Sequence, residues 1–280
     1  MAQRALPERE ARLGRPHGAV GQAPHAVVLV LPGDSGGALR GSALAAAAAL
    51  PLARRLGRAS SRDDPLAAHV VHYRSPAHRD GTAGRTAEET VPAGAVPAAA
   101  DSRTEHGGCA YAEDAEWAVE EVVRRYGDVP VCLVGRGVGG RAALRAAGHS
   151  AVVSVVALGP VLECADGADG AEEAEPVRHL RGRHVLLVHG TNDARSDPEL
   201  SFRFAERAKK INAQVCRFEV HTDGHGLRGY AAEVAALTRD FVLGTLCARD
   251  LCRPLTDALA APPPLGLRMP LASGFGKSLR

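Results

Sequence analysis

The sequence predicts one α/β domain with a doubly wound, mostly parallel sheet of about six strands. Runs rich in β-branched residues alternate with helical segments along the chain. Most of these runs are apolar throughout, which is typical of strands buried on both faces of a parallel sheet. The expected strands span residues 27–31, 69–73, 129–134, 152–158, 185–189 and 215–220.

Three helices between and after these strands can be predicted individually. The segment 112–126 places apolar residues on one stripe, begins with acidic residues and ends before a glycine, as a helix in this position should. Asp197 is a predicted N-cap, and Pro198 suits the first turn of a helix that runs to about residue 211. A last helix over about 230–246 closes the domain.

The composition is that of a soluble globular protein. The chain has 280 residues, enough for one large α/β domain, and 45% of them are hydrophobic while 24% are charged. A net charge of +2 provides no basic surface for nucleic acid, which we therefore exclude as a partner. The six cysteines form no C-x-x-C pair, so we expect free thiols in a reducing compartment and no metal site.

No segment has the pattern of a membrane span or a signal peptide. The longest apolar stretch, around residues 43–50, is too short to cross a bilayer, and the charged first twelve residues contain no apolar signal core. We expect a cytoplasmic protein with no membrane partner.

The domain is expected to span residues 25–247. Residues 1–24 are polar and interrupted by glycine and proline, and we expect a flexible N-terminal segment there. Residues 248–280 contain three consecutive prolines and a basic end, which predicts a low-complexity tail. Within the domain, residues 76–108 form an Ala/Gly/Pro/Thr-rich insertion without periodicity, which we expect to be mobile.

The hexapeptide from Gly135 to Gly140 follows the third strand directly and precedes an alanine-rich helical run. Interpreted as Gly135-x-Gly137-x-x-Gly140 between strand and helix, it is a phosphate-cradling turn of a nucleotide-binding unit. Interpreted as G-x-S-x-G, it is a nucleophile elbow in which Gly137 replaces the serine.

Reactive residue types follow three other predicted strands. In doubly wound sheets the ligand site lies at the carboxyl ends of the strands. Asp34 and Ser35 follow the first strand, Asp193 the fifth and His225 the sixth. The order of Gly137, Asp193 and His225 is that of nucleophile, acid and histidine in hydrolases with a nucleophile elbow, which favours the elbow over the phosphate cradle.

These motifs resemble the α/β-hydrolase superfamily, particularly compact bacterial esterase-like and dienelactone-hydrolase-like members. The resemblance covers about residues 26–246 and is carried by the segments 27–33, 71–74, 131–140, 186–193 and 223–226. It implies an ester hydrolase that needs no cofactor and takes an ester-like or apolar small molecule. The segment 161–183, where this family commonly inserts a lid, is too short for a large cap, so we expect an open site.

The resemblance also implies a role for each site residue. Asp193 would orient His225, and His225 would act as general base. The backbone N–H groups of Val138 and of Asp34 or its neighbour would form the oxyanion hole. Gly137 departs from the family at the nucleophile and excludes an acyl-enzyme there. The triad is therefore degenerate, and the protein is expected to be a weak hydrolase or a pseudoenzyme.

Four functions remain open after this comparison. A relocated nucleophile at Ser35 would restore covalent catalysis, although a turn or helix-cap role for this serine is more common. The empty pocket could bind a small molecule or protein without converting it. Water held between His225 and Gly137 could attack the substrate directly. The glycine turn could bind a nucleotide, with Glu163 as the acid after the next strand.

Overall fold

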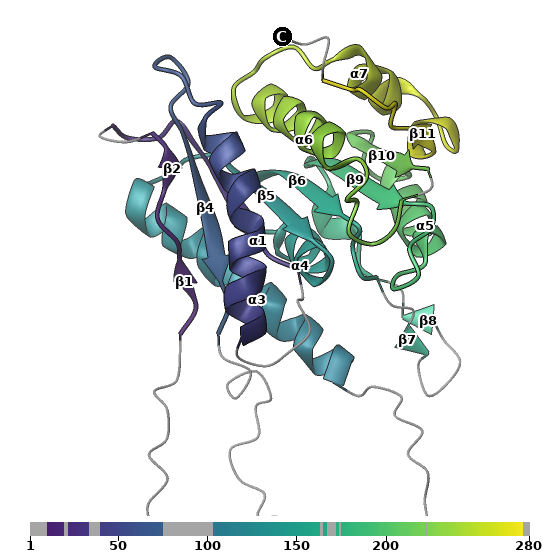
Figure 1. The fold of residues 1–280 in the computed structure, drawn as a ribbon, viewed down its shortest axis with the longest axis horizontal. Helices are drawn as coiled ribbons and strands as arrows, with labels where there is room; N and C mark the ends of the chain where they lie inside the picture. The colour runs from purple at the N-terminus through teal and green to yellow at the C-terminus, as the bar shows by residue number, and fades with distance from the viewer. Residues whose placement is uncertain are drawn as a thin grey trace, which may run out of the picture.

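The computed structural model describes residues 10–19, 22–33, 40–74, 103–162, 165–166, 172–173, 175–221 and 223–276. Within these ranges, nine strands form one sheet in the order β1-β4-β3-β5-β6-β9-β10-β11, with β2 paired to β4 (Figure 1). All six predicted strands are present and pair in parallel. They are β3 (Ala26–Leu31), β4 (Leu66–His72), β5 (Val131–Arg136), β6 (Val152–Leu158), β9 (His184–Gly190) and β10 (Val215–Val220).

The prediction of six strands is wrong at the edges of the sheet. β1 (Arg12–Leu13) and β2 (His17–Gly18) pair antiparallel with β4, and β11 (Met269–Pro270) pairs parallel with β10. Each edge strand has two residues, which is too short for a periodic pattern to appear in the sequence.

The folded part of the chain therefore extends beyond both predicted limits of the domain, residues 25 and 247. β1 and β2 lie within the segment predicted to be flexible, and α7 (Arg253–Ala260) lies within the predicted tail. Leu255 of α7 is fully buried, and so is Leu267, which follows it in the short helical turn η2 (Leu265–Leu267). Burial of such side chains outweighs the proline-rich composition from which a tail was predicted.

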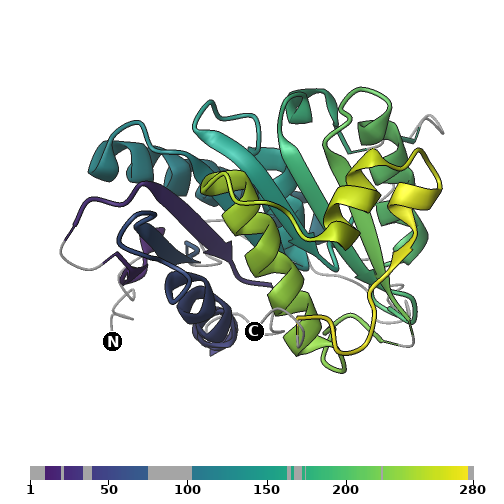
Figure 2. The same ribbon diagram turned by 90° about the horizontal axis from the view of Figure 1, so that it is seen from above.

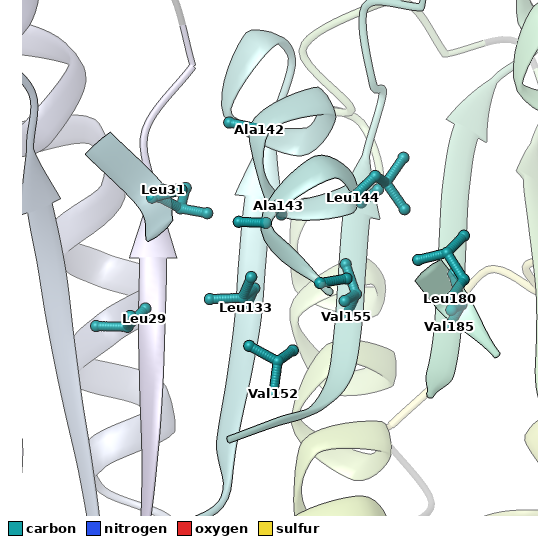
Figure 3. Packing of buried hydrophobic residues seen from close by; sticks show 14 of the residues in the cluster. Leu29, Leu31, Leu133, Ala142, Ala143, Leu144, Val152, Val155, Leu180 and Val185 are labelled. Carbon is teal, nitrogen blue, oxygen red and sulfur yellow. The ribbon is translucent and has the colours of Figure 1, made fainter. Parts of the chain in front are cut away.

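Helices cover both faces of the sheet. α1 (Arg40–Gly57), α6 (Ala231–Leu246) and α7 pack on one face, and α3 (Arg103–Tyr126), α4 (Val138–Ala146) and α5 (Pro198–Lys209) on the other (Figure 2). Figure 3 shows Leu133 and Val155 of neighbouring strands beside Ala143 and Leu144 of α4. None of the helices in the described ranges is long and apolar enough to cross a membrane.

Two predictions about the helices have different outcomes. Asp197 caps α5 as predicted, because its Oδ1 accepts a hydrogen bond from the N–H of Glu199 at 2.9 Å. The helix predicted from residue 112 begins at Arg103, so the last residues of the predicted 76–108 insertion are helical. Glycines at 107 and 108 obscured this start, because glycine disfavours a helix interior. Residues 75–102 lie outside the described ranges.

Between β6 and β9 the described residues form only short elements. β7 (Ala165–Asp166) and β8 (Glu172–Glu173) pair as a two-stranded sheet, and η1 (Arg178–Leu180) is a single helical turn. The small size of these elements agrees with the prediction that the segment 161–183 forms no large cap.

The chain reverses its direction of winding between β3 and β5. From β3 it crosses through α1 to β4 on one side, and it then returns through α3 to β5 on the other side of β3. Ligand sites in open α/β sheets lie outside the carboxyl ends of strands at such a switch point. The residues that follow β3 and β5 are Pro32-Gly33 and Gly137, so the predicted site lies at this position.

We expect the protein to lose stability when the pH falls through about 6.5. Burial lowers the pKa of His69, His184 and His189 below the ordinary 6.5. Below that pH these histidines bind protons in the unfolded chain but stay neutral in the folded protein. Acid therefore lowers the free energy of unfolding. Urea denaturation at a series of pH values should give a midpoint that is constant above neutrality and falls below it. A midpoint that stays constant down to about pH 5.5 would contradict this expectation.

Candidate active site

The turn between β5 and α4 has the shape of a nucleophile elbow. Gly137 is the N-cap of α4 and has a φ of 54° and a ψ of −122°, in a region that side-chain-bearing residues rarely adopt. A Cβ added to Gly135 would lie 2.0 Å from the oxygen of Gly139, and one added to Gly139 would lie 2.4 Å from the oxygen of Pro32. Gly135 and Gly139 are therefore required, because backbone atoms pack where a side chain would lie.

Gly137 differs from these two glycines because the atom nearest to an added Cβ belongs to a side chain, which would have to shift by a few tenths of an ångström, and not to the backbone. An ideal Cβ at Gly137 would have the Nε2 atom of His225 as its nearest neighbour, at 3.3 Å, and the Cα of Gly33 at 3.9 Å. A serine hydroxyl placed there would come within hydrogen-bonding reach of that nitrogen. The turn thus places Gly137 against His225, at the position predicted for the nucleophile.

Asp193 and His225 form a hydrogen-bonded pair. The Nδ1 atom of His225 lies 2.8 Å from the Oδ2 atom of Asp193, and the Asp193 side chain is completely buried. Its Oδ1 atom accepts the N–H groups of Arg195 at 2.8 Å and Ser196 at 3.1 Å. Burial by itself would raise the pKa of Asp193, but these bonds and that from His225 prevail and lower it. The carboxylate is therefore ionised and aimed at His225.

The structure thus brings together three of the predicted site residues, Gly137, Asp193 and His225. Val138 is the first residue of α4, and its N–H has no acceptor within the helix because the preceding turn is missing. The oxyanion-hole role of this N–H stays a prediction. Asp34 and Ser35 lie outside the described residues, and so does Glu163.

A cavity of about 880 Å³ opens beside His225 and the elbow. Alanines of α1 and Leu52 form an apolar wall, and His225 and Arg136 lie among the polar residues that line it. Burial lowers the pKa of Arg136, whose Nη1 donates to the carbonyl of Gly226 at 2.5 Å. The lining therefore combines an apolar wall with polar groups near His225.

The sequence analysis missed His189, Arg195 and Ser196. The backbone of the last two binds Asp193, and the fully buried His189 contacts the same carboxylate through its Nε2 atom, 3.2 Å from Oδ2. The signal for His189 was its position near the end of β9, four residues before Asp193, where a side chain can turn back toward the loop. Backbone donors leave no signal in the side-chain pattern.

Comparison with known proteins establishes the fold. The sequence matches no protein-family model, and no curated protein matches it. Among solved structures, it is similar to an esterase of Pyrococcus furiosus at 13% identity, with a TM-score of 0.56 over 85% of this chain and 91% of that one. A thermophilic esterase of Thermogutta terrifontis is 17% identical, with a TM-score of 0.56 over 86% and 92% of the two chains.

A lidless α/β serine hydrolase of Xanthomonas campestris is 14% identical to this chain, with a TM-score of 0.52 over 89% of this chain and 100% of that one. At these identities the similarity concerns the fold alone. Together with the parallel sheet and its two helical layers, it shows that the chain has the α/β-hydrolase fold.

Proposed function

We propose that the protein binds a small ester-like molecule in the cavity lined by Arg136 and His225 and hydrolyses it slowly through water, without an acyl-enzyme. The observation that carries this proposal is the Asp193–His225 pair. The Nε2 atom of His225 has no hydrogen-bond partner among the described residues and lies 3.3 Å from the position of an added Cβ at Gly137. A general base retained above a vacated nucleophile position is suited to activating a water molecule there.

The proposed reaction needs no group beyond those in the site. A water molecule in the Gly137 gap gives its proton to Nε2 of His225 while its oxygen attacks the ester carbonyl. The N–H of Val138 donates to the oxyanion that forms, and Asp193 stabilises the imidazolium. Collapse of the tetrahedral intermediate expels the alkoxide, which takes the proton from His225. Acid and alcohol leave, and the histidine is neutral again.

The missing serine limits the expected rate. Loss of the nucleophile from a comparable triad costs on the order of 10⁶-fold in kcat, and the rest of the site retains about 10³–10⁴-fold over water. We therefore place the protein among weak hydrolases of the ester-bond type.

His225→Gln should abolish the slow hydrolysis of short aryl esters, because glutamine cannot accept the proton from water. His221→Gln is the matched control, since His221 is exposed and lies in the same stretch of chain after β10. Initial rates measured over hours at high protein concentration should show a histidine-dependent rate with no initial burst. A burst, or labelling of the natural protein by a fluorophosphonate, would contradict the proposal and point to a serine elsewhere, such as Ser35.

A second candidate function is binding without conversion. It is favoured by the absence of a nucleophilic side chain at Gly137 together with the cavity of about 880 Å³ that His225 and Arg136 line. Thermal stabilisation by an ester-like ligand that is recovered unchanged would support it. A nucleotide cradle is disfavoured, because the His225 ring lies above Gly137 where a pyrophosphate would approach. A titration with NADH fluorescence should show no binding.

A further inference from the structure

Asp193 binds a second histidine on the side away from the elbow. Its Oδ2 atom lies 2.8 Å from Nδ1 of His225 and 3.2 Å from Nε2 of His189. The reaction described above uses only His225. The side chains of Asp193 and His189 are both 0% exposed, so no water competes for this contact.

The hydrogen-bond partners of His189 define its protonation. Its Nε2 atom faces two acceptors, Oδ2 of Asp193 and the carbonyl of Ser196, both at 3.2 Å, so Nε2 carries a proton. Burial and the nearby charge of Arg217 lower the pKa of His189, so the ring is neutral and its Nδ1 atom is an acceptor.

The donor to Nδ1 is the hydroxyl of Ser201, whose oxygen lies 2.8 Å away. The same oxygen lies 2.8 Å from the carbonyl of Pro198, but that carbonyl also accepts from Nη2 of Arg217 at 3.1 Å. The hydroxyl of Ser201 has one proton for these two acceptors. Because the neutral His189 ring carries its proton on Nε2, we assign the Ser201 proton to Nδ1, and the carbonyl of Pro198 keeps Arg217 as its donor. The Ser201 oxygen accepts in turn from Nε of Arg217 at 3.0 Å.

These contacts form a chain in which every proton points toward Asp193. Arg217 donates to Ser201, Ser201 to His189 and His189 to Asp193, and His225 donates to the same carboxylate from the opposite side. The members of this chain come from β10, α5, β9 and the loop after β9. The Glu219 carboxylate neutralises the charge of Arg217 and accepts from its Nη1 atom at 2.7 Å. Successive hydrogen bonds of one direction polarise and strengthen one another.

We propose that His189 is a positioning residue of the site, held in its Nε2–H form by Ser201 and Arg217. It fixes the rotamer of Asp193 and shares the Oδ2 atom with His225. Because Oδ2 accepts from both histidines, its hydrogen bond to the Nδ1–H of His225 is weaker than it would be with one donor. The same contacts hold the His225 ring over Gly137. This inference goes beyond the proposed function and holds whether or not the site hydrolyses an ester.

The protonation state can be measured directly in the full chain labelled with ¹⁵N-histidine. Long-range ¹H–¹⁵N spectra should show His189 as a neutral ring protonated at Nε2 between about pH 6 and pH 8. The variant His189→Gln assigns the signals. A ring protonated at Nδ1, or an imidazolium at His189 in this range, would overturn the proposal.

The sharing of Oδ2 predicts a change at His225 when His189 is removed. In His189→Phe the low-field proton resonance of the His225–Asp193 bond should move further downfield, because one donor to Oδ2 is lost. In His189→Gln it should stay near its original position, because the glutamine amide can replace the Nε2–H. An unchanged resonance in a folded His189→Phe protein would refute the sharing.

Ser201→Ala tests the chain if His189→Phe does not fold. It removes the donor to Nδ1 of His189. The ¹⁵N chemical shift of Nδ1 should then move toward the value of an unprotonated imidazole nitrogen that accepts no hydrogen bond. No change at Nδ1 would overturn the proposal. In hydrolysis assays, His189→Phe should lower kcat with little effect on KM, and His189→Gln should recover it. This last comparison alone rests on the proposed function.

Discussion

Gly137→Ser should turn the protein into an esterase that is labelled covalently. An ideal Cβ at Gly137 lies 3.3 Å from Nε2 of His225, so a hydroxyl on it can donate to that nitrogen. The positive φ of 54° costs a serine about 1–2 kcal/mol, a strain that nucleophile elbows bear as a rule. We expect ester hydrolysis to rise by at least about 100-fold over the natural protein.

Fluorophosphonate labelling followed by mass spectrometry of the intact protein measures this effect. The natural protein and Gly137→Ala should remain unlabelled, and Gly137→Ala also reports the cost of a side chain at this φ. Adding His225→Gln to Gly137→Ser should remove both the labelling and the activity. If Gly137→Ser folds and stays unlabelled, His225 and the elbow do not form the arrangement described above.

Arg217→Met should destabilise the protein by about 3–5 kcal/mol. The Arg217 side chain is 1% exposed and binds the Glu219 carboxylate at 2.7 Å and the carbonyl of Leu267 at 2.9 Å. It also donates to Ser201 and to the carbonyl of Pro198. Methionine fills a similar volume but supplies no donor, so several buried acceptors lose a partner at once.

Arg268→Met is the matched control for this change. Arg268 also pairs with Glu219, at 3.2 Å, and with Glu199, but its side chain is 44% exposed. Exposed ion pairs contribute about 0–1 kcal/mol, so this variant should stay close to the natural protein. Urea denaturation of both variants provides the comparison. Equal losses of stability would show that burial of the Arg217 guanidinium does not carry the effect.

The central part of the fold was predictable because each long strand carries its own pattern. β6 and β10 have the predicted limits, and the other four central strands differ by a few residues. Continuous apolar runs report burial on both faces, and this burial is a property of each strand alone. The edge strands β1, β2 and β11 contain two residues each, and their pairing depends on the neighbouring strand, so no local pattern marks them.

The meeting of three candidate residues was predictable to the same extent. Gly137, Asp193 and His225 were found because each follows a long strand, and the carboxyl ends of parallel strands meet at one edge of the sheet. His189 was not found, because its task depends on Ser201 and Arg217, which come from other elements. The backbone donors to Asp193 are equally invisible in a list of side chains.

The sequence by itself determined the α/β class, the order of the central strands along the chain and the absence of a side chain at the elbow. These properties follow from local apolar runs and from residue identity. Only the tertiary structure decided that His225 Nε2 faces the empty position of Gly137 and that Asp193 is held between two histidines. Such contacts join residues distant in the chain, and their geometry exists only once the sheet and its helices have packed.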